Sequence, residues 1–213
     1  MATCYAALED RLLVVRGSGR DWTLRERLKE SDIECVAAAP AAPERIFVGT
    51  VETGLERSTD GGDSWEATLH AGDRVTAVTV DPNDPDVIWA GTEPSGLYRS
   101  TDGGETWTER PGVLDLPSTD QWSFPPRPDT HHVRWIAVDP TNPERLYVAV
   151  EAGALLLSTD GGESWPNDRP GRATTTTRSR HTPRRQPAST RPRVTATQSP
   201  STVVRAGTTP RRA

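Results

Sequence analysis

Short apolar runs rich in β-branched residues recur along residues 1–165, and each run is closed by a turn signal. The clearest unit predicts four strands, at Val75–Val80, Val87–Thr92, Leu97–Thr101 and Thr106–Arg110. Four short strands in about 42 residues match the size of a β-propeller blade, whereas solenoid repeats are usually shorter or helical. The pattern therefore predicts an all-β fold built from propeller blades.

Three segments of 26 residues superimpose without gaps, at 40–65, 82–107 and 140–165. Each has proline at its first and fourth positions, an aromatic residue at its eighth, and Ser-Thr-Asp-Gly-Gly near its end. The interval is 42 residues from Asp60 to Asp102 and 58 from Asp102 to Asp160, so the second interval holds 16 additional residues. A fixed period of this length is the signature of a repeat architecture.

The octapeptides STDGGDSW, STDGGETW and STDGGESW resemble the Asp-box of bacterial neuraminidase (BNR) repeats, Ser-x-Asp-x-Gly-x-Ser/Thr-Trp. The resemblance covers residues 36–165, and a worn copy at Tyr5–Trp22 has Val15 and Gly17 in place of Ser and Asp. The family includes sialidases, sortilin-like receptors, xyloglucan-degrading enzymes, a photosystem II assembly factor and other WD40/YVTN/BNR-like repeat proteins. It implies an unclosed β-propeller fragment of about four blades, with no single activity.

The chemistry of the box is structural. Its Asp carboxylate accepts hydrogen bonds from turn N–H groups, its glycines allow positive φ, and its Trp covers the hairpin with an apolar face. In the family the box joins the third and fourth strands, away from the central site, so a catalytic role for these carboxylates is disfavoured. We assign folding roles to Ser58, Asp60, Gly62, Trp65, Ser100, Asp102, Gly104, Trp107, Ser158, Asp160, Gly162 and Trp165.

Ligand-binding candidates lie on the inner strands, predicted at Ile33–Ala39, Val75–Asp81 and Val133–Asp139. Two-residue alternation places polar side chains at equivalent positions on one side of these strands. They are Asp32, Arg74 and His132, followed by Glu34, Thr76 and Arg134. Such residues are expected to line a channel mouth that takes a carbohydrate or protein ligand. Ordinary solvation of strand ends explains them equally well.

The 16 additional residues fall within Leu114–Arg134, which also holds Asp120 and Asp129. In this loop Trp122 and Phe124 are candidates for stacking on a sugar ring, and His131 and His132 for metal binding or proton transfer. Adjacent strand residues face opposite ways, so one metal held by both histidines is disfavoured, and we expect no metal or other cofactor. A loop that packs its own aromatic residues over the propeller is the favoured alternative.

A sialidase requires three arginines around the substrate carboxylate, a Tyr nucleophile with a Glu partner, and an Asp acid. The matched inner-strand positions are Glu34, Thr76 and Arg134, which supply one arginine. Tyr98 and Tyr147 occupy repeat positions where packing explains them. No catalytic residue is therefore assigned, and the leading interpretation is a binding or scaffold module. The alternatives are a glycosidase-like hydrolase whose catalytic blades lie elsewhere and an adaptor with a basic tail.

Charge divides the chain at Trp165. The following 48 residues hold 11 Arg and one acid, Asp168, which gives a net charge of +10. Residues 1–165 hold 14 basic and 29 acidic residues, which gives a net charge of −15, and the two parts sum to −5. Without aromatic residues the segment 166–213 buries too little apolar area to fold, so we predict a disordered tail. Its scattered arginines and lack of stacking residues argue against nucleic-acid binding.

The genetic code offers another interpretation of the tail. Read one base out of frame, Thr202–Thr208 is compatible with Asp-Gly-Gly-Ala-Ser-Trp-Asp, a fourth Asp-box, and Pro183–Thr190 with a Pro-x-x-Pro opening. The chain is then a truncated propeller whose tail is a frameshifted blade.

We expect a cytoplasmic location and no membrane partner, because no apolar run spans a bilayer and no signal peptide is present. Cys4 and Cys35 are interpreted as buried thiols.

Overall fold

The structure, a computed structural model, describes residues 2–39, 41–70, 74–122, 130–166 and 203–205. Within these ranges it is all-β apart from two short 3₁₀ helices, η1 (Pro111–Val113) and η2 (Thr119–Gln121). No helix in the described part of the chain is both long and apolar enough to cross a bilayer.

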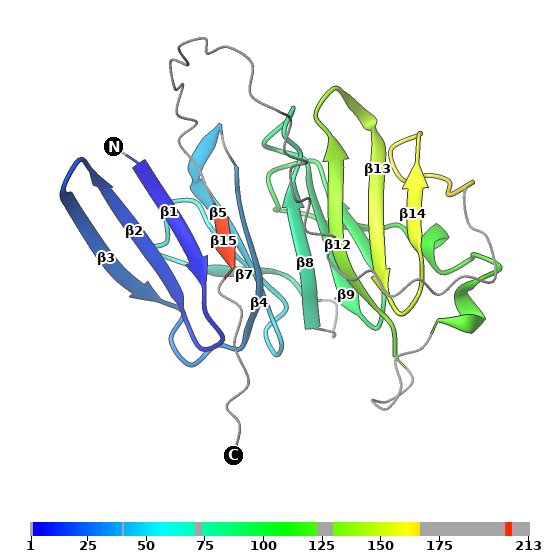
Figure 1. Cartoon of the computed structure of the whole chain (residues 1–213), viewed down its shortest axis with the longest axis horizontal. Helices are drawn as coiled ribbons and strands as arrows, with labels where there is room; N and C mark the ends of the chain where they lie inside the picture. Colours follow the sequence, from blue (N-terminus) through cyan, green and yellow to red (C-terminus); the bar gives the residue numbers. More distant parts are fainter. Residues whose placement is uncertain (1, 40, 71–73, 123–129, 167–202, 206–213) are drawn as a thin grey trace, which may run out of the picture.

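The strands form four small sheets, here called blades 1 to 4 (Figure 1). Blade 1 contains β1 (Ala2–Ala7), β2 (Leu12–Ser18), β3 (Asp21–Arg27) and β15 (Val203–Arg205). Blade 2 contains β4 (Ile33–Ala39), β5 (Ala42–Thr50), β6 (Leu55–Ser58) and β7 (Glu66–Leu69). Blade 3 contains β8 (Arg74–Val80), β9 (Ile88–Glu93), β10 (Leu97–Ser100) and β11 (Thr108–Glu109). Blade 4 contains β12 (His132–Asp139), β13 (Asn142–Glu151) and β14 (Leu155–Ser158).

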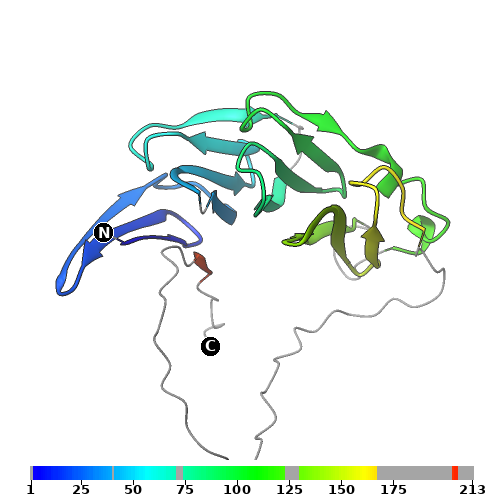
Figure 2. The ribbon, with the colours of Figure 1, turned by 90° about the horizontal axis from the view of Figure 1, so that it is seen from above.

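The blades follow one another along an open arc (Figure 2), so the prediction of an unclosed, all-β propeller fragment of four blades is confirmed. The inner strand of blade 2 has the bounds predicted from the sequence, and those of blades 3 and 4 differ by one residue. The last strand of blade 3 is shorter than the predicted Thr106–Arg110. The Asp-box explains this difference, because Asp102 Oδ1 accepts the Thr106 N–H at 2.9 Å and keeps that residue in the turn.

Apolar clusters fill the spaces between consecutive blades. Tyr5, Val14 and Ile46 share the cluster between blades 1 and 2, while Phe47 and Val75 share the one between blades 2 and 3. The third and largest cluster lies between blades 3 and 4 and includes Trp89, Trp122, Val133 and Leu146. Each blade is therefore stabilised mainly by burying its faces against its neighbours.

The Asp-box carboxylates bond within their own turns. Asp60 accepts hydrogen bonds from the Ser58 and Ser64 hydroxyls at 2.8 and 2.6 Å and from the Asp63 and Ser64 N–H groups at 2.9 Å each. These bonds favour the ionised form, so they lower the pKa of Asp60 well below its usual range. Gly62 has φ of 94°, a conformation that suits glycine. Matching serine–aspartate bonds recur at Asp102 and Asp160.

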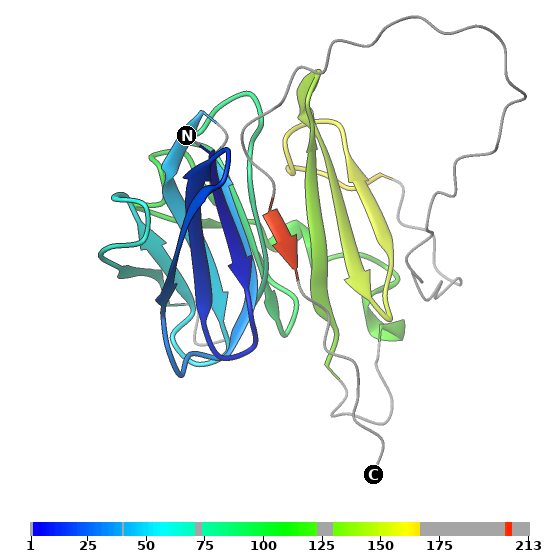
Figure 3. The same ribbon diagram turned by 60° about the vertical axis from the view of Figure 1, so that its left-hand side comes forward.

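Blade 1 departs from the expectations in its inner strand. Residues Val203–Arg205 pair in parallel with Tyr5–Ala7 of β1 and fill the inner position (Figure 3). The prediction that 166–213 is disordered throughout is therefore wrong for these three residues; 167–202 and 206–213 lie outside the described residues. The physical reason is that the edge of β1 offers N–H and C=O groups that an extended segment satisfies.

The two cysteines remain thiols. Both are partly buried, whereas the sequence predicted buried thiols. Cys35 sits where blades 2 and 3 meet, with its Sγ 3.6 Å from the carbonyl oxygen of Val75.

Candidate functional site

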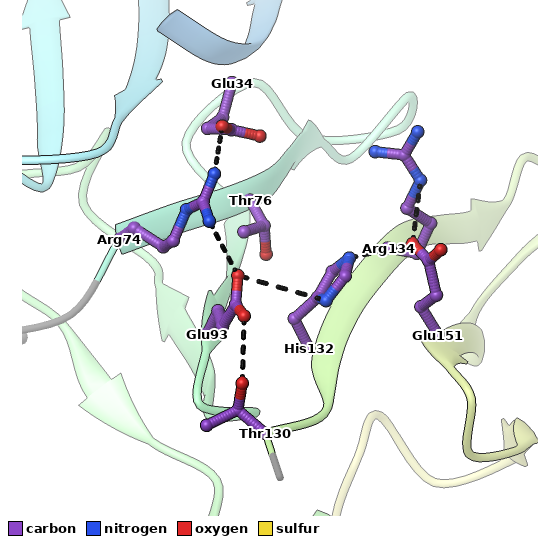
Figure 4. Close-up of a pocket in the computed structure, with 8 residues that line it drawn as sticks. All are labelled: Glu34, Arg74, Thr76, Glu93, Thr130, His132, Arg134 and Glu151. Atoms are coloured by element: carbon purple, nitrogen blue, oxygen red, sulfur yellow. Dashed lines mark hydrogen bonds and ion pairs between the residues drawn. The ribbon is translucent and has the colours of Figure 1, made fainter. Parts of the chain in front are cut away.

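One cavity of about 390 Å³ opens at an end of the inner strands of blades 2, 3 and 4 (Figure 4). It is lined by Glu34, Arg74, Thr76, Glu93, Thr130, His132, Arg134 and Glu151. Every lining residue is polar. With His132 counted as a base, six of the eight are acidic or basic, and the other two are Thr76 and Thr130. A concave site in which polar groups of several elements converge is suited to ligand binding.

A repeated irregularity of the inner strands positions part of this site. The register of β4 against β5 skips one residue between Ile33 and Cys35, and β8 and β12 do the same between Val75 and Ala77 and between Val133 and Trp135. The skipped residues are Glu34, Thr76 and Arg134. A β-bulge redirects the side chain of its extra residue, and here all three extra residues line the cavity.

Arg74 links two of the carboxylates. Its Nη1 lies 2.9 Å from Glu93 Oε2, and its Nη2 donates to Glu34 Oε1 on the neighbouring blade. The second oxygen of Glu93 accepts the hydroxyl of Thr130 at 3.0 Å. The Arg74 guanidinium therefore holds Glu34 and Glu93 in place, and part of its donor capacity is already used inside the protein.

His132 and Arg134 share the third carboxylate. His132 Nε2 lies 2.9 Å from Glu151 Oε2 and its Nδ1 lies 4.0 Å from Glu93 Oε2, so the imidazole stands between two carboxylates. Arg134 Nε lies 3.5 Å from the same oxygen of Glu151, and 47% of the Arg134 side chain is exposed. Arg134 is therefore the most exposed of the three basic groups that line the cavity.

Thr76 ties the base of the cavity together. Its side-chain hydroxyl donates to the carbonyl oxygen of Val133 at 2.7 Å, across the junction of blades 3 and 4. Thr76 is buried, and Gly91 of the adjacent strand lets Val133 approach closely. The geometry of the cavity thus depends on how closely blades 3 and 4 pack.

The structure brings together five of the six inner-strand candidates, namely Glu34, Arg74, Thr76, His132 and Arg134. Asp32 does not line the cavity; its carbonyl oxygen accepts the N–H of Val51 at 3.0 Å. The cavity holds two arginines, because Arg74 lines it beside Arg134, the one arginine at the matched positions Glu34, Thr76 and Arg134. Phe124 and Asp129 lie outside the described residues.

Trp122 and His131 do not line the cavity. Trp122 is 5% exposed, packs in the cluster between blades 3 and 4, and donates from Nε1 to Ser118 Oγ at 3.0 Å. His131 stands edge-on to Trp122 with ring centroids 5.3 Å apart. Burial lowers the pKa of His131 from 6.5, and His132 lowers it further. The loop thus packs its aromatic residue inward, and the proposed stacking role of Trp122 on a ligand is not supported.

Glu93 and Glu151 were missed in the sequence. They stand at the same repeat position, directly after the buried core of the second strand, and oppose Arg74 and His132 in the registers of their sheets. The equivalent residue of blade 2 is Val51. A search for polar residues at matched positions of the second strand, besides the first, would have found both glutamates.

A metal centre is not built from the described residues, which contain no group of three or more His, Cys, Asp and Glu suited to one ion. The Asp-box carboxylates are absent from the cavity lining. The site offers three carboxylates, two guanidinium groups, one imidazole and two hydroxyls. This set can donate and accept hydrogen bonds in many directions, as recognition of a polar ligand requires.

A family model described as "BNR/Asp-box repeat" matches residues 98–109, which run from β10 through the Asp-box of blade 3. The chain therefore carries a BNR/Asp-box repeat at these residues. The octapeptides of blades 2 and 4 fold with the same serine–aspartate hydrogen bonds. No curated protein sequence matches the chain.

Several solved structures are similar to it. The GH74 enzyme of Niastella koreensis is 20% identical over 62% of this chain and 22% of its own length, with a TM-score of 0.48. An ancestral GH74 enzyme is 24% identical over 62% of this chain and 17% of its own, with a TM-score of 0.49. A structure of YCF48 bound to D1 peptide is 16% identical over 77% of this chain and 81% of its own, with a TM-score of 0.40. The chain therefore spans less than a quarter of either GH74 enzyme.

Proposed function

We propose that this BNR/Asp-box chain is a binding module that holds a polar ligand, such as a carbohydrate, in the cavity of blades 2 to 4. The observation that carries the proposal is the convergence of Glu34, Thr76 and Arg134, the three bulge residues of consecutive inner strands. A bulge costs ladder hydrogen bonds, and one repeated at a cavity mouth is typical of a site that must aim its side chains.

The charges of the cavity indicate the chemical class of the ligand. Arg74 is paired with Glu34 and Glu93, and Glu151 lies against His132 and Arg134. Since these charges already compensate one another, a strongly charged ligand has to break an ion pair before it binds. A neutral molecule with many hydroxyls can instead bond to the outward atoms of the same groups. This favours an oligosaccharide over an anion.

The test measures binding of a neutral xyloglucan oligosaccharide and of cellotetraose by calorimetry and by ¹⁵N amide shifts. We expect saturable shifts at His132 and Arg134 and at least a tenfold loss of affinity in Arg134→Ala, since an interaction of about 1.4 kcal/mol corresponds to tenfold. Arg145→Ala is the matched control, because Arg145 is a blade 4 arginine with a side chain 44% exposed outside the cavity. Absence of saturable shifts with either sugar contradicts the carbohydrate proposal.

A hydrolase is the second candidate, and one observation favours it. Glu93 and Glu151 flank a single imidazole, at 4.0 and 2.9 Å from the two ring nitrogens of His132. Glycoside hydrolases use two carboxyl groups on either side of the scissile bond. Release of reducing sugar from xyloglucan, lost in both Glu93→Gln and Glu151→Gln, would favour this function over binding alone.

A further inference from the structure

Large apolar side chains are exposed at the two ends of the blade series. Among the described residues, five are exposed, and four of them lie on the outer blades. Trp22 and Leu24 of β3 are 50% and 59% exposed, and Trp135 of β12 and Leu155 of β14 are 55% and 53% exposed. The fifth is Leu114, which directly follows η1. Exposed apolar residues gathered on two sheets mark interaction surfaces.

The exposed side of blade 4, here called the rear face, follows from strand alternation. Val133, Ile136, Leu146 and Leu156 belong to the cluster shared with blade 3. The residues that alternate with them point the other way. These rear-face residues are Trp135, Ala137, Tyr147, Ala149, Leu155 and Leu157. These six residues are apolar apart from the tyrosine hydroxyl, and Arg145, which also alternates with Leu146, has its Nη1 3.4 Å from Asp139 Oδ2.

The same repeat positions are buried in blades that have a following blade. The equivalents of Tyr147 are Phe47 and Trp89, which are 0% and 3% exposed. Glycines of the next Asp-box cover them: a Cβ added to Gly104 or Gly162 would lie 2.6 or 2.9 Å from the respective ring. Blade 4 therefore presents the surface that, at each junction inside the chain, accepts the next blade.

The equivalents of Leu155 show the same contrast. They are Leu55 and Leu97, which are 0% and 1% exposed. The equivalents of Trp135 are Cys35 and Ala77, and Cys35 contacts the inner strand of blade 3 through Val75. A blade docked on the rear face would cover Trp135 and Leu155 as the chain's own blades cover these residues.

The opposite end presents the complementary side of a blade, here called the front face. Arg27 of β3 reaches blade 2, where its Nη2 lies 2.6 Å from Asp63 Oδ1. Alternation therefore turns Trp22 and Leu24 away from blade 2. Together with Cys4, Ala6, Leu13 and Val15 of the adjacent strands they form an apolar front face. β15 supplies the inner strand beside it, so blade 1 has four strands.

We propose that two copies of this chain pack head to tail, with the rear face of blade 4 of each copy against the front face of blade 1 of the other. A second copy is the expected partner because, at all three junctions within the chain, the front face of one blade covers the rear face of the blade before it. Four blades along an open arc (Figure 2) and four from a second copy make eight, within the usual range of about 4–8 for closed propellers. A two-fold axis makes the two junctions equivalent and closes the ring.

The first measurement is the mass of the full 213-residue chain by light scattering after size exclusion, over a hundredfold range of concentration. Two copies of 23.2 kDa give 46.4 kDa, and the mass should reach this value and rise no further. A species of 23.2 kDa at every concentration overturns the proposal. Continued growth of the mass overturns the closed ring, since a junction that does not close makes filaments.

Single charge substitutions then test the two faces. Trp135→Glu on the rear face and Leu24→Glu on the front face should each give a monomer, because each alters both junctions of the ring. Leu114→Glu is the control, since Leu114 is exposed outside both faces, and it should stay dimeric. All three residues are exposed, so far-UV circular dichroism should report unchanged folding.

Mixing the two monomeric variants separates this arrangement from any other dimer. In a mixed pair, one junction combines both substitutions, but the other combines an unchanged rear face with an unchanged front face. A one-to-one heterodimer should therefore form when Trp135→Glu and Leu24→Glu are mixed, with weaker affinity than the original dimer. If no heterodimer forms, the contact joins like faces or involves another surface, and the head-to-tail proposal is overturned.

Discussion

Replacing Gly91 with alanine should loosen the junction between blades 3 and 4. A Cβ built on Gly91 lies 2.5 Å from Val133 Cβ, whereas ordinary contact begins near 3.4 Å, so β12 has to retreat by about 0.9 Å. The neighbouring hydrogen bond from Thr76 to the Val133 carbonyl, 2.7 Å long, has to lengthen with it. The substitution therefore disturbs both the apolar junction and the base of the cavity.

The expected loss follows from two opposing effects. Overpacking costs about 1–3 kcal/mol, and the stiffer unfolded chain of the alanine variant returns about 0.4–1 kcal/mol. The net decrease in the free energy of unfolding is about 1–2 kcal/mol. With a urea m-value of about 2 kcal/mol/M, the midpoint should fall by roughly 0.5–1 M.

The assay is urea denaturation followed by tryptophan fluorescence and far-UV circular dichroism. Gly112→Ala is the control, because its nearest atoms would lie 3.7 Å or more from the new Cβ and its backbone needs no positive φ. We expect the control to match or slightly exceed the original stability. If Gly91→Ala is as stable as Gly112→Ala, close approach of β9 and β12 does not govern this junction.

Three further predictions concern the Asp-box, the core and activity. Hydrogen bonds from Ser158 and Ser164 lower the pKa of Asp160 from 3.8 to about 2. Its stabilising contribution is therefore complete above pH 3.8 and lost as pH falls through about 2. In acid titrations, the stability of the original chain and that of Asp160→Asn should therefore converge near this lower pH. Trp122→Ala should cost about 3–5 kcal/mol in urea denaturation. The chain should not cleave a fluorogenic sialoside; turnover abolished by Arg134→Ala would contradict this.

The repeat pattern was sufficient to predict the blades because apolar alternation and Asp-box turns are local properties of the chain. The inner strand Ile33–Ala39 was predicted with its observed bounds, but the direction of Glu34 depends on a bulge that alternation alone does not predict. The strand β15 could not be predicted, since its parallel pairing with β1 joins residues about 200 positions apart and carries no periodic signal.

The long loop after blade 3 shows where composition misleads. Trp122 was assigned a possible ligand role because aromatic residues in long loops often bind, but its ring is more favourably buried between blades, with Nε1 bonded to Ser118. Exposure depends on tertiary packing, which the residue type does not determine. Glu93 and Glu151 were missed for the converse reason, because their role appears only when second strands are aligned with one another.

The bulges explain how one repeat carries both a constant fold and a variable site. In blades 2 and 3 the residues on either side of the bulge are apolar or small: Ile33 and Cys35 in β4, and Val75 and Ala77 in β8. These flanking residues pack between blades. The bulge residue itself lines the cavity, and Glu, Thr and Arg occupy it in successive blades. Exchanging Glu34 and Arg134 should therefore alter ligand binding while leaving the urea midpoint nearly unchanged, and a large fall in that midpoint would show that the bulges serve folding instead.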